Sequence, residues 1–349
     1  MPNIKDIKIT PPMLAVITEI EAFKASWNGF THLRPEQLKT LRKVSTIESI
    51  GSSNRIEGNK LSDFEIEKLL SRMNITSFKS RDEEEVVGYA KLMETIFDDY
   101  TVIPFSENYI KQLHKILLQY TGKDAKHRGE YKKLSNAVAA YDTKGKKIGV
   151  IFETAAPFDT PRLMAELIEW TQKNLNDPFL HPLIVIGVFV VHFLAVHPFQ
   201  DGNGRLSRAL TAMLLLKSGY AYVPYSSIES IIEACKDGYY RALRGTQKNI
   251  FSGRVDYEPW LSFFLTTLQK QKRHLENKIS VIAGDITKFG KNARAILALF
   301  DEKAEWTSLE IATDLKMNIE TTKKNLKSLV NGGYLTKHGT TKGAWYEKK

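Results

Sequence analysis

The stretch HPFQDGNGRLSR, residues 197–208, separates two apolar segments and decides the fold of the chain. Before it, Leu183 to Val196 contains a single polar side chain, His192, and after it Ala209 to Leu216 resumes an apolar helical pattern. This order predicts a buried helix, a loop and a second helix. Pro198 is expected to end the first helix, because proline cannot continue one.

The residues of this loop suit a phosphate group. Gly202 and Gly204 flank Asn203, so that the backbone can adopt positive φ and its N–H groups can converge on an anion. The following helix, expected to begin near Gly204, directs its free N–H groups and positive dipole end at the same anion. Arg205 and Arg208 lie three residues apart and suit bidentate phosphate contacts.

Four more residues in and beside the loop have predicted roles. Asp201 is a hard oxygen ligand that can hold Mg²⁺ between phosphate oxygens, and His197 is the natural general base. Phe199 is expected to fill the core beneath the loop, and His192 to be a hydrogen-bonded core histidine. Each residue alone also fits a turn, a cap or simple packing, whereas the combination indicates a nucleoside triphosphate site.

Residues 197–208 match in full the pattern H-x-F-x-[DE]-G-N-G-R-x-x-R, and in this the chain resembles the Fic (filamentation induced by cAMP) family. The resemblance implies an all-α fold in which the motif joins two central helices. It implies an enzyme that transfers AMP from ATP to a Ser, Thr or Tyr hydroxyl of a target protein, with His197 as the base and Asp201 holding Mg²⁺. The implied nucleotide-binding residues are Gly202, Asn203, Gly204, Arg205, Leu206, Ser207 and Arg208.

A second motif lies upstream, at residues 53–58. It follows a helix-like stretch from Leu38 to Ser52, and Gly58 is placed as a helix C-cap, which gives a helix over about 38–58. Ser53 and Glu57 therefore share one helix face. A carboxylate at the negative end of a helix dipole is mildly unfavourable, so a cation is expected to face Glu57.

This motif is similar to the [ST]-x-x-x-E-[GN] inhibitory motif of many Fic proteins, and the residues that match it are Ser53, Glu57 and Gly58. The resemblance implies that Glu57 pairs with Arg208 and holds the enzyme inactive in cis. The simpler alternative is a solvated carboxylate at the end of a helix.

Residues 142–157 carry a glycine-centred turn followed by β-branched residues, which predicts a short hairpin. In the family the equivalent hairpin, the flap, pairs with the target main chain, and the resemblance places it at Ile151, Phe152, Glu153 and Thr154. An ordinary surface hairpin is the alternative.

Residues 237–243 resemble the Tyr-Tyr-x-x-Leu segment that lines the adenine site of the family. The implied contacts are Tyr239, Tyr240 and Leu243. The chain has Gln247 where family members often have Asn, which puts the polar contact at that position in doubt. Paired tyrosines also serve as ordinary packing residues.

The length and composition of the chain limit its possible domain number, cysteine chemistry and location. The chain has 349 residues, 42% of them hydrophobic, which predicts at least two domains. A single cysteine excludes an intrachain disulfide and a cysteine-based zinc site. Because charged residues interrupt the start and the longest apolar run is too short to span a bilayer, the expected location is the cytoplasm. The net charge of +10 is spread along the chain and does not by itself indicate nucleic acid.

The predicted domains are an N-terminal helical region over 1–100, a catalytic core over 101–283 and a small domain over 284–349. In the last, helices at 292–300, 308–315 and 319–330 precede a hairpin around 338–343, an order that resembles a winged helix. The exposed residues of its third helix would be Thr321, Thr322, Lys323, Asn325 and Lys327. From residue 291 onward there are eleven Lys and Arg against seven Asp and Glu, so DNA contact and protein docking both stay open.

Two other functions fit the sequence. The chain could be a DNA-binding regulator whose Fic body senses nucleotide, or a Fic enzyme that removes AMP through Glu57 or moves UMP, phosphocholine or phosphate. Retention of both His197 and Asp201 argues against a purely sensory body, because binding alone needs no base. A homodimer is compatible with the sequence.

Overall fold

The computed structural model of the protein describes residues 2–27, 35–72, 77–141, 147–287, 289–300, 303–331, 334–339 and 344–348. For 137–141, 147–153, 281–287 and 348 the description is limited to the backbone. In chain order the elements are η1 (Ile4–Asp6), α1 (Pro11–Trp27), α2 (Pro35–Ile56), α3 (Asp63–Leu70), α4 (Arg81–Asp99), α5 (Glu107–Leu117), η2 (Gly122–Asp124), β1 (Ala137–Tyr141), β2 (Lys147–Glu153), α6 (Thr160–Leu175), α7 (Pro182–Val196), α8 (Asn203–Lys217), η3 (Val223–Tyr225), α9 (Ile228–Ala234), α10 (Lys236–Gln247), α11 (Glu258–Thr287), α12 (Lys291–Leu299), β3 (Glu305–Thr307), α13 (Ser308–Asp314), α14 (Ile319–Asn331), β4 (Leu335–His338) and β5 (Trp345–Lys348).

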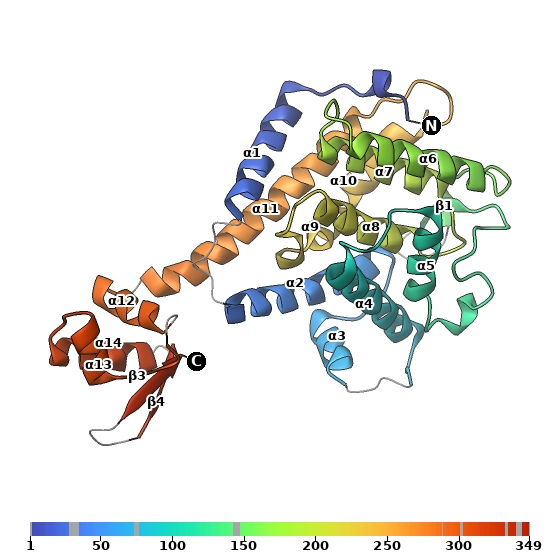
Figure 1. The fold of residues 1–349 in the computed structure, drawn as a ribbon. Coiled ribbons are helices and arrows are strands. Elements are labelled where there is room, and N and C mark those ends of the chain that lie inside the picture. Colours follow the sequence, from blue (N-terminus) through green and yellow to red (C-terminus); the bar gives the residue numbers. More distant parts are fainter. Residues whose placement is uncertain are drawn as a thin grey trace. The chain divides into compact units, whose positions relative to one another are not determined.

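The chain folds as two compact units, Met1–Leu275 and Glu276–Lys349 (Figure 1). In its described residues the first is helical with one β-hairpin, and the second combines short helices with a small sheet. This confirms the predicted all-α body with minor β structure. The first unit contains the predicted N-terminal region and most of the predicted catalytic core, whose last eight residues, 276–283, belong to the second unit. Among the helices that the structure describes, none combines the length and apolar composition needed to cross a lipid bilayer.

Helices α7 and α8 form the centre of the first unit (Figure 1). Every residue of α7 from Leu183 to Val196 is buried, as its apolar composition on all faces requires. The helix is covered by α6 and α10, and the Trp260 indole donates a hydrogen bond to the Gly187 carbonyl (2.7 Å). The loop between α7 and α8 is thereby held by two helices that cannot shift without disrupting the core.

Helix α2 ends beside this centre, and its termination is built into the sequence. Gly58 has φ +100°, its N–H donates to the Arg55 carbonyl, and the Asn59 N–H donates to the Asn54 carbonyl. These two bonds close the helix in the manner of a glycine C-cap, as predicted. The helix packs against α4 and α9. The last turn of α2, with residues 53–57, is therefore held in a fixed position within the first unit.

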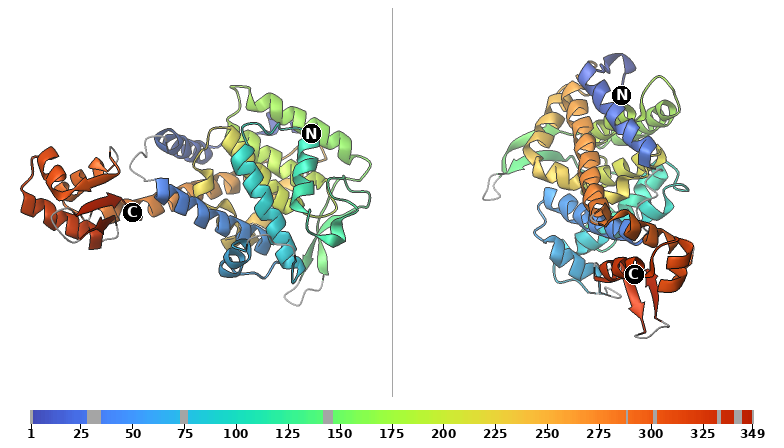
Figure 2. Two further views of the ribbon diagram at one scale, coloured as in Figure 1. Left: turned by 60° about the horizontal axis from the view of Figure 1, so that its bottom comes forward. Right: turned by 90° about the vertical axis from the view of Figure 1, so that its left-hand side faces the viewer.

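The predicted hairpin is formed by β1 and β2, at the edge of the helical unit (Figure 2). The strands are antiparallel, with Val138 opposite Phe152 and Ala139 opposite Val150, and the pairing shifts register twice. The predicted glycine-centred turn, residues 142–146, lies outside the described residues. In the described chain this sheet consists of β1 and β2, so each strand has one edge that is not paired with another strand.

In the second unit the three predicted helices and the two strands that follow them occur in the predicted order, whereas β3, between α12 and α13, was not predicted. Helices α12, α13 and α14 begin and end within one residue of the predicted bounds, and a three-stranded sheet in the order β3–β5–β4 packs with them. One prediction is wrong: Thr322 is fully buried, with its hydroxyl donating to the Asn318 carbonyl (3.1 Å). The helical period places Thr322 on the same face as Leu326 and Leu329, which fill the core, whereas Lys323 is exposed.

Candidate active site

An open cavity lies at the loop between α7 and α8. Its space is about 710 Å³ including the mouth, within the range of small-molecule sites. The lining residues that the sequence predicted are Glu57, His197, Asp201, Gly202, Asn203, Gly204, Arg205, Tyr239, Tyr240, Leu243 and Gln247. Leu194, Gln200 and Arg244 also line it and were not predicted. Leu206, Ser207 and Arg208, which are buried in α8, are not among the described residues that line it.

His197 lies at the C-terminal end of α7 in the left-handed region, with φ 53° and ψ 59°. Its Nδ1 lies 3.2 Å from the Leu194 carbonyl oxygen. A carbonyl only accepts, so Nδ1 carries the proton and Nε2 presents a free lone pair. Burial lowers the pKa of His197 to about 4, with the nearby Lys132 ammonium acting in the same direction. The imidazole is therefore neutral at pH 7 and can accept a proton.

The side chain of Asn203 stabilises the loop through two hydrogen bonds to the main chain of Phe199. Its side-chain oxygen accepts from the Phe199 N–H (2.9 Å), and its side-chain amide donates to the Phe199 carbonyl (2.7 Å). Phe199 itself is fully buried, as predicted. Gly202 has φ +79° and precedes α8, which begins at Asn203, so that only the first of the two glycines takes a positive φ. Gly204 belongs to the first turn of the helix, where backbone N–H groups have no intrahelical partner.

His114 of α5 supports the loop and was not predicted from the sequence. Its ring stacks on Phe199 with 3.8 Å between centroids, and its Nδ1 accepts from the Gly129 N–H (2.9 Å). Nε2 must then carry the proton, and it donates to the Asp201 carbonyl (3.0 Å). Burial lowers the pKa of His114 to about 4, which favours this neutral form. The loop is thus fixed by a side chain 87 residues away in sequence.

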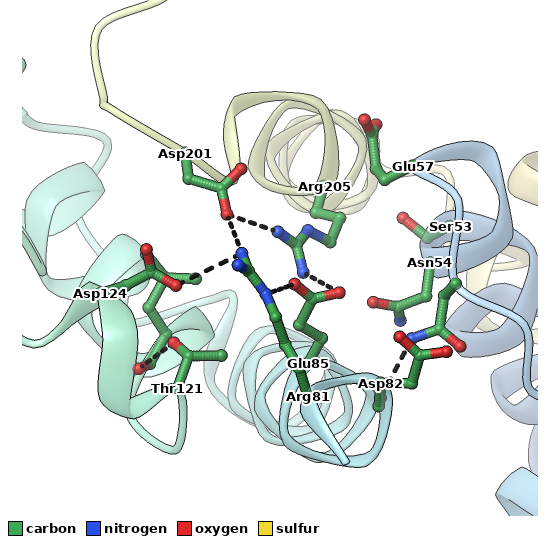
Figure 3. A network of polar contacts seen from close by, with 12 residues as sticks. Ser53, Asn54, Glu57, Arg81, Asp82, Glu85, Thr121, Asp124, Asp201 and Arg205 are labelled. Atoms are coloured by element: carbon green, nitrogen blue, oxygen red, sulfur yellow. Dashed lines mark hydrogen bonds and ion pairs between the residues drawn. The ribbon is translucent and has the colours of Figure 1, made fainter. Parts of the chain in front are cut away.

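The Asp201 carboxylate is held by two arginines (Figure 3). Its Oδ2 lies 3.0 Å from Nη2 of Arg81, the first residue of α4, and 3.3 Å from Nη2 of Arg205. Arg81 also pairs with Glu85 at 2.7 Å, and Glu85 approaches Arg205 at 3.3 Å. Burial raises the pKa of Asp201, but Arg205 and Arg81 outweigh it and hold that pKa below its usual range. Asp201 is therefore ionised at neutral pH.

A single carboxylate beside a phosphate nest is a donor set that fits Mg²⁺, which takes one or two carboxylates together with substrate phosphates and water. Within the described residues, no three His, Cys, Asp or Glu side chains converge as a metal site made by protein alone. The donors at Asp201 therefore suit a cation that arrives with a phosphate ligand.

Glu57 and Arg208 form an ion pair, with 2.8 Å between Oε1 and Nη2. Arg208 is buried and also donates from Nε to the Ser53 hydroxyl and from Nη2 to the Ser53 carbonyl, both at 2.9 Å. The cation expected to face Glu57 is thus Arg208, and Ser53 lies on the same face of α2. Burial among protein atoms raises the pKa of Glu57, and the charge of Arg208 overcomes this and lowers it.

The Glu57 carboxylate also lies against the start of α8. A Cβ built on Gly204 would collide with Glu57 Oε1, so the carboxylate occupies the space that the glycine leaves open. Its side chain keeps 35% of its surface exposed, toward the cavity. The end of a helix where N–H groups are free attracts anions. Glu57 is therefore an anionic group placed in a position suited to phosphate.

Part of the cavity lining is aromatic. Tyr239 and Tyr240 of α10 contact each other edge to face, with 5.2 Å between ring centroids. Leu243 and Gln247 follow on the same helix, and the Gln247 amide makes a long hydrogen bond of 3.5 Å to the Val191 carbonyl. Such a surface can stack a planar base, while the buried amide supplies a polar group nearby.

The predicted target-docking residues lie at the end of β2. The structure gives the backbone of Ile151, Phe152 and Glu153, whose side chains lie outside the described residues. Thr154 follows the strand, and its hydroxyl donates to the main-chain carbonyl of Asn136 (2.7 Å).

Comparison with known proteins places the site in a family. Residues 104–215 match the family model Fic/DOC family. The chain is similar to two proteins named Protein adenylyltransferase Fic: 28% identical over 195 residues in Culex quinquefasciatus and 29% over 189 residues in Aedes aegypti. These stretches cover 54% and 52% of this chain, and only 36% and 34% of the longer relatives.

Solved structures show the same fold. A Fic family protein from Desulfovibrio desulfuricans G20 is similar with a TM-score of 0.62 and 20% identity, over 99% of this chain and 98% of that one. A Fic domain containing signaling protein from Bacteroides thetaiotaomicron gives a TM-score of 0.58 and 23% identity, over 76% and 97%. The helical arrangement, the matched residues 104–215 and the loop at 197–208 agree, and residues 104–215 of the chain form a domain that matches the Fic/DOC family.

Proposed function

We propose that the protein is an adenylyltransferase that transfers AMP from ATP to a hydroxyl side chain of a target protein. The main support for this proposal is that a base and a phosphate nest line the same cavity. His197, with the lone pair of Nε2 free to accept a proton, lies beside the N-terminus of α8. The names of the curated relatives support the same reaction.

The proposed reaction is an in-line displacement at the α-phosphorus of ATP. His197 Nε2 accepts the proton of the target hydroxyl, whose oxygen forms the new bond to phosphorus. The bond from that phosphorus to the oxygen of the β-phosphate breaks, and pyrophosphate leaves. The N-terminus of α8 and Arg205 face the phosphate charge. Most of the rate then comes from positioning and charge stabilisation, with the base contributing about 10²- to 10⁴-fold.

Asp201 would hold Mg²⁺ at the edge of the nest, where the cation would neutralise phosphate charge. The adenine base would lie on Tyr239 and Tyr240, with Leu243 and Gln247 beside it. The target segment would add to the unpaired edge of the hairpin by main-chain hydrogen bonding.

Glu57 is the proposed inhibitor in cis. Its carboxylate occupies space beside Gly204 and neutralises Arg208, so a phosphate arriving there meets a like charge and a cation already paired. Removing the carboxylate should free both positions for the nucleotide.

The test measures incorporation of label from α-labelled ATP into protein with Mg²⁺, using cell extract as the source of acceptors. We expect Glu57→Gly to label protein at least tenfold faster than wild type, and Glu57→Gly with His197→Ala to label hardly at all. Glu36→Gly is a matched control, because it removes an exposed carboxylate from the first turn of the same helix, α2.

Equal labelling by wild type and Glu57→Gly would contradict the inhibitory role. If none of the variants labels protein, the transfer reaction itself is wrong. The nucleotide-sensing regulator would then be tested by salt-dependent binding to duplex DNA, lost when Lys323 and Lys327 are replaced by alanine.

A further inference from the structure

Lys132 is a buried lysine beside the candidate site that the mechanism above does not use. Its side chain is 3% exposed, and it lies in the segment that precedes β1. The main chain at this point runs alongside the catalytic loop: the Lys132 N–H donates to the Pro198 carbonyl (2.8 Å), and Tyr131 forms a β-bridge with Phe199. The backbone therefore places this lysine next to the residues that follow His197 in the catalytic loop.

The ammonium group of Lys132 donates three hydrogen bonds. Its acceptors are the Val196 carbonyl (2.9 Å), the Asn136 side-chain oxygen (2.9 Å) and the Thr154 hydroxyl (2.8 Å). All three are neutral, and within the described residues no carboxylate forms an ion pair with this lysine. A buried charge without a counter-ion costs free energy, so a purely space-filling role would be served better by an apolar side chain.

The three acceptors come from three different segments. Asn136 precedes β1, Thr154 follows β2, and Val196 is the residue before His197. The Thr154 hydroxyl donates to Asn136, and the Asn136 amide donates to the Phe199 carbonyl (2.9 Å). Both ends of the hairpin are therefore joined to each other and to the catalytic loop, and Lys132 is the group that contacts all three.

We infer that Lys132 is a positioning residue that fixes the base of the β1–β2 hairpin to the catalytic loop. Held in this way, a target segment paired with the hairpin edge stands at a set distance from His197 Nε2. This inference rests on the proposed function in one respect, namely that the hairpin docks the target. The attachment of the hairpin to the loop does not depend on it.

Two variants separate positioning from packing. Lys132→Met keeps the length of the side chain and removes the charge and all three donors. Lys133→Met is the matched control, because the neighbouring lysine is exposed. Thr154→Val removes one acceptor while keeping the shape, and it serves as a second test if Lys132→Met does not fold.

The first measurement is hydrogen–deuterium exchange of the β1 and β2 amides. Loss of the three bonds should speed exchange in Lys132→Met about tenfold, because each 1.4 kcal/mol of lost protection changes the opening equilibrium tenfold. Thr154→Val should show a smaller increase in the same strands, and Lys133→Met none. Unchanged exchange in folded Lys132→Met and Thr154→Val would overturn the inference.

The second measurement compares two acceptors in the Glu57→Gly background. Labelling of extract protein needs the hairpin, whereas hydrolysis of ATP to AMP needs only water, the loop and the nucleotide. Lys132→Met should lower the ratio of protein labelling to hydrolysis about tenfold, with the KM for ATP unchanged. A ratio equal to that of Lys133→Met would overturn the positioning role. If exchange is faster in Lys132→Met but no variant transfers AMP, the proposed function is rejected. The inference that Lys132 fixes the hairpin to the catalytic loop is then still supported.

Discussion

His197 combines an uncommon backbone conformation with a fixed side chain. The left-handed φ of 53° turns the chain sharply after α7, and the bond from Nδ1 to the Leu194 carbonyl sets the tautomer. Because the backbone and the ring are both held, Nε2 is directed before any ligand arrives. A pre-oriented base loses little entropy when the substrate binds.

Replacing this residue separates catalysis from binding. In the Glu57→Gly background, His197→Ala should lower the rate of AMP transfer by about 10²- to 10⁴-fold, since that is the usual contribution of a general base. The affinity for an ATP analogue, measured by calorimetry, should change less than about threefold, because the nest and the arginines are intact. Transfer at a near-normal rate in the double variant would show that another group accepts the proton.

Individual residues were predictable where the signal was local. His197, Phe199 and Asn203 lie within one short loop, whose turn chemistry and spacing are visible in the sequence. His114, Arg81 and Lys132 were missed because each reaches the loop from a distant segment, and a single histidine, arginine or lysine in an amphipathic stretch has no pattern to distinguish it. Gly204 was assigned a positive φ, whereas it is helical and is needed for the space that it leaves to Glu57.

The first turn of α4 contributes a cation to the site. Arg81 stands at the start of the helix and binds the Asp201 carboxylate, the predicted Mg²⁺ ligand (Figure 3). The side chain of Arg81 is 42% exposed, so the pair is worth only on the order of 1 kcal/mol. Under the proposed function, a divalent cation that arrives with phosphates would compete with this arginine for the same oxygen.

Removal of Arg81 should therefore strengthen metal binding. In Glu57→Gly, adding Arg81→Gln should lower the Mg²⁺ concentration needed for half-maximal binding of an ATP analogue by up to about fivefold, in line with an exposed ion pair. Lys91→Gln on the same helix is the control, since Lys91 pairs with Glu94 on the surface. If Arg81→Gln weakens binding instead, Arg81 contacts the nucleotide and does not compete with the metal.

Elements were predictable to different degrees. The boundaries of the buried α7 and the C-terminal end of α2 followed from apolar composition and from Gly58, because these features act within one or two turns. The first strand of the hairpin was not predicted, and its pairing with β2 is irregular, with two shifts of register. Thr322 was misplaced on the exposed face of α14, because a short polar side chain in a helix can satisfy its hydroxyl on the preceding turn and enter the core.

Across the first unit, three buried histidines are held neutral. Burial lowers the pKa of His114 and His197 to about 4 and that of His192 to about 3. The unfolded chain keeps the ordinary value near 6.5, so between these limits it binds more protons than the folded chain. The contribution of these histidines to the free energy of unfolding is therefore complete above about pH 6.5 and is lost as the pH is lowered toward 4.

His192 offers a clean test of this linkage, because it lies away from the loop and its Nε2 is paired with the Tyr257 hydroxyl (2.7 Å). His192→Gln keeps a polar partner for the tyrosine and removes the titrating group. The free energy of unfolding, from urea titrations at pH 7, 6 and 5, should fall less steeply in the variant, by up to about 1.4 kcal/mol per pH unit. Parallel slopes for the two proteins would show that His192 does not titrate on unfolding.

At the scale of the molecule, the all-α body and the small C-terminal unit were predictable from periodicity, because long helices carry a repeating apolar pattern. The resemblance to the Fic family followed from one twelve-residue loop. The extent of the first unit could not be predicted from the sequence, since 1–100 and 101–275 pack together through contacts that no local pattern reveals.

The ion pair between Glu57 and Arg208 joins residues 151 positions apart in one chain. Its formation is a first-order event, so its occupancy does not depend on how much of the protein a solution or a cell contains. Dilution cannot release such a contact, and neither can overproduction. Only something that acts on the chain itself, by moving the end of α2 or by offering Arg208 a better anion, can change the fraction of molecules in which it is broken.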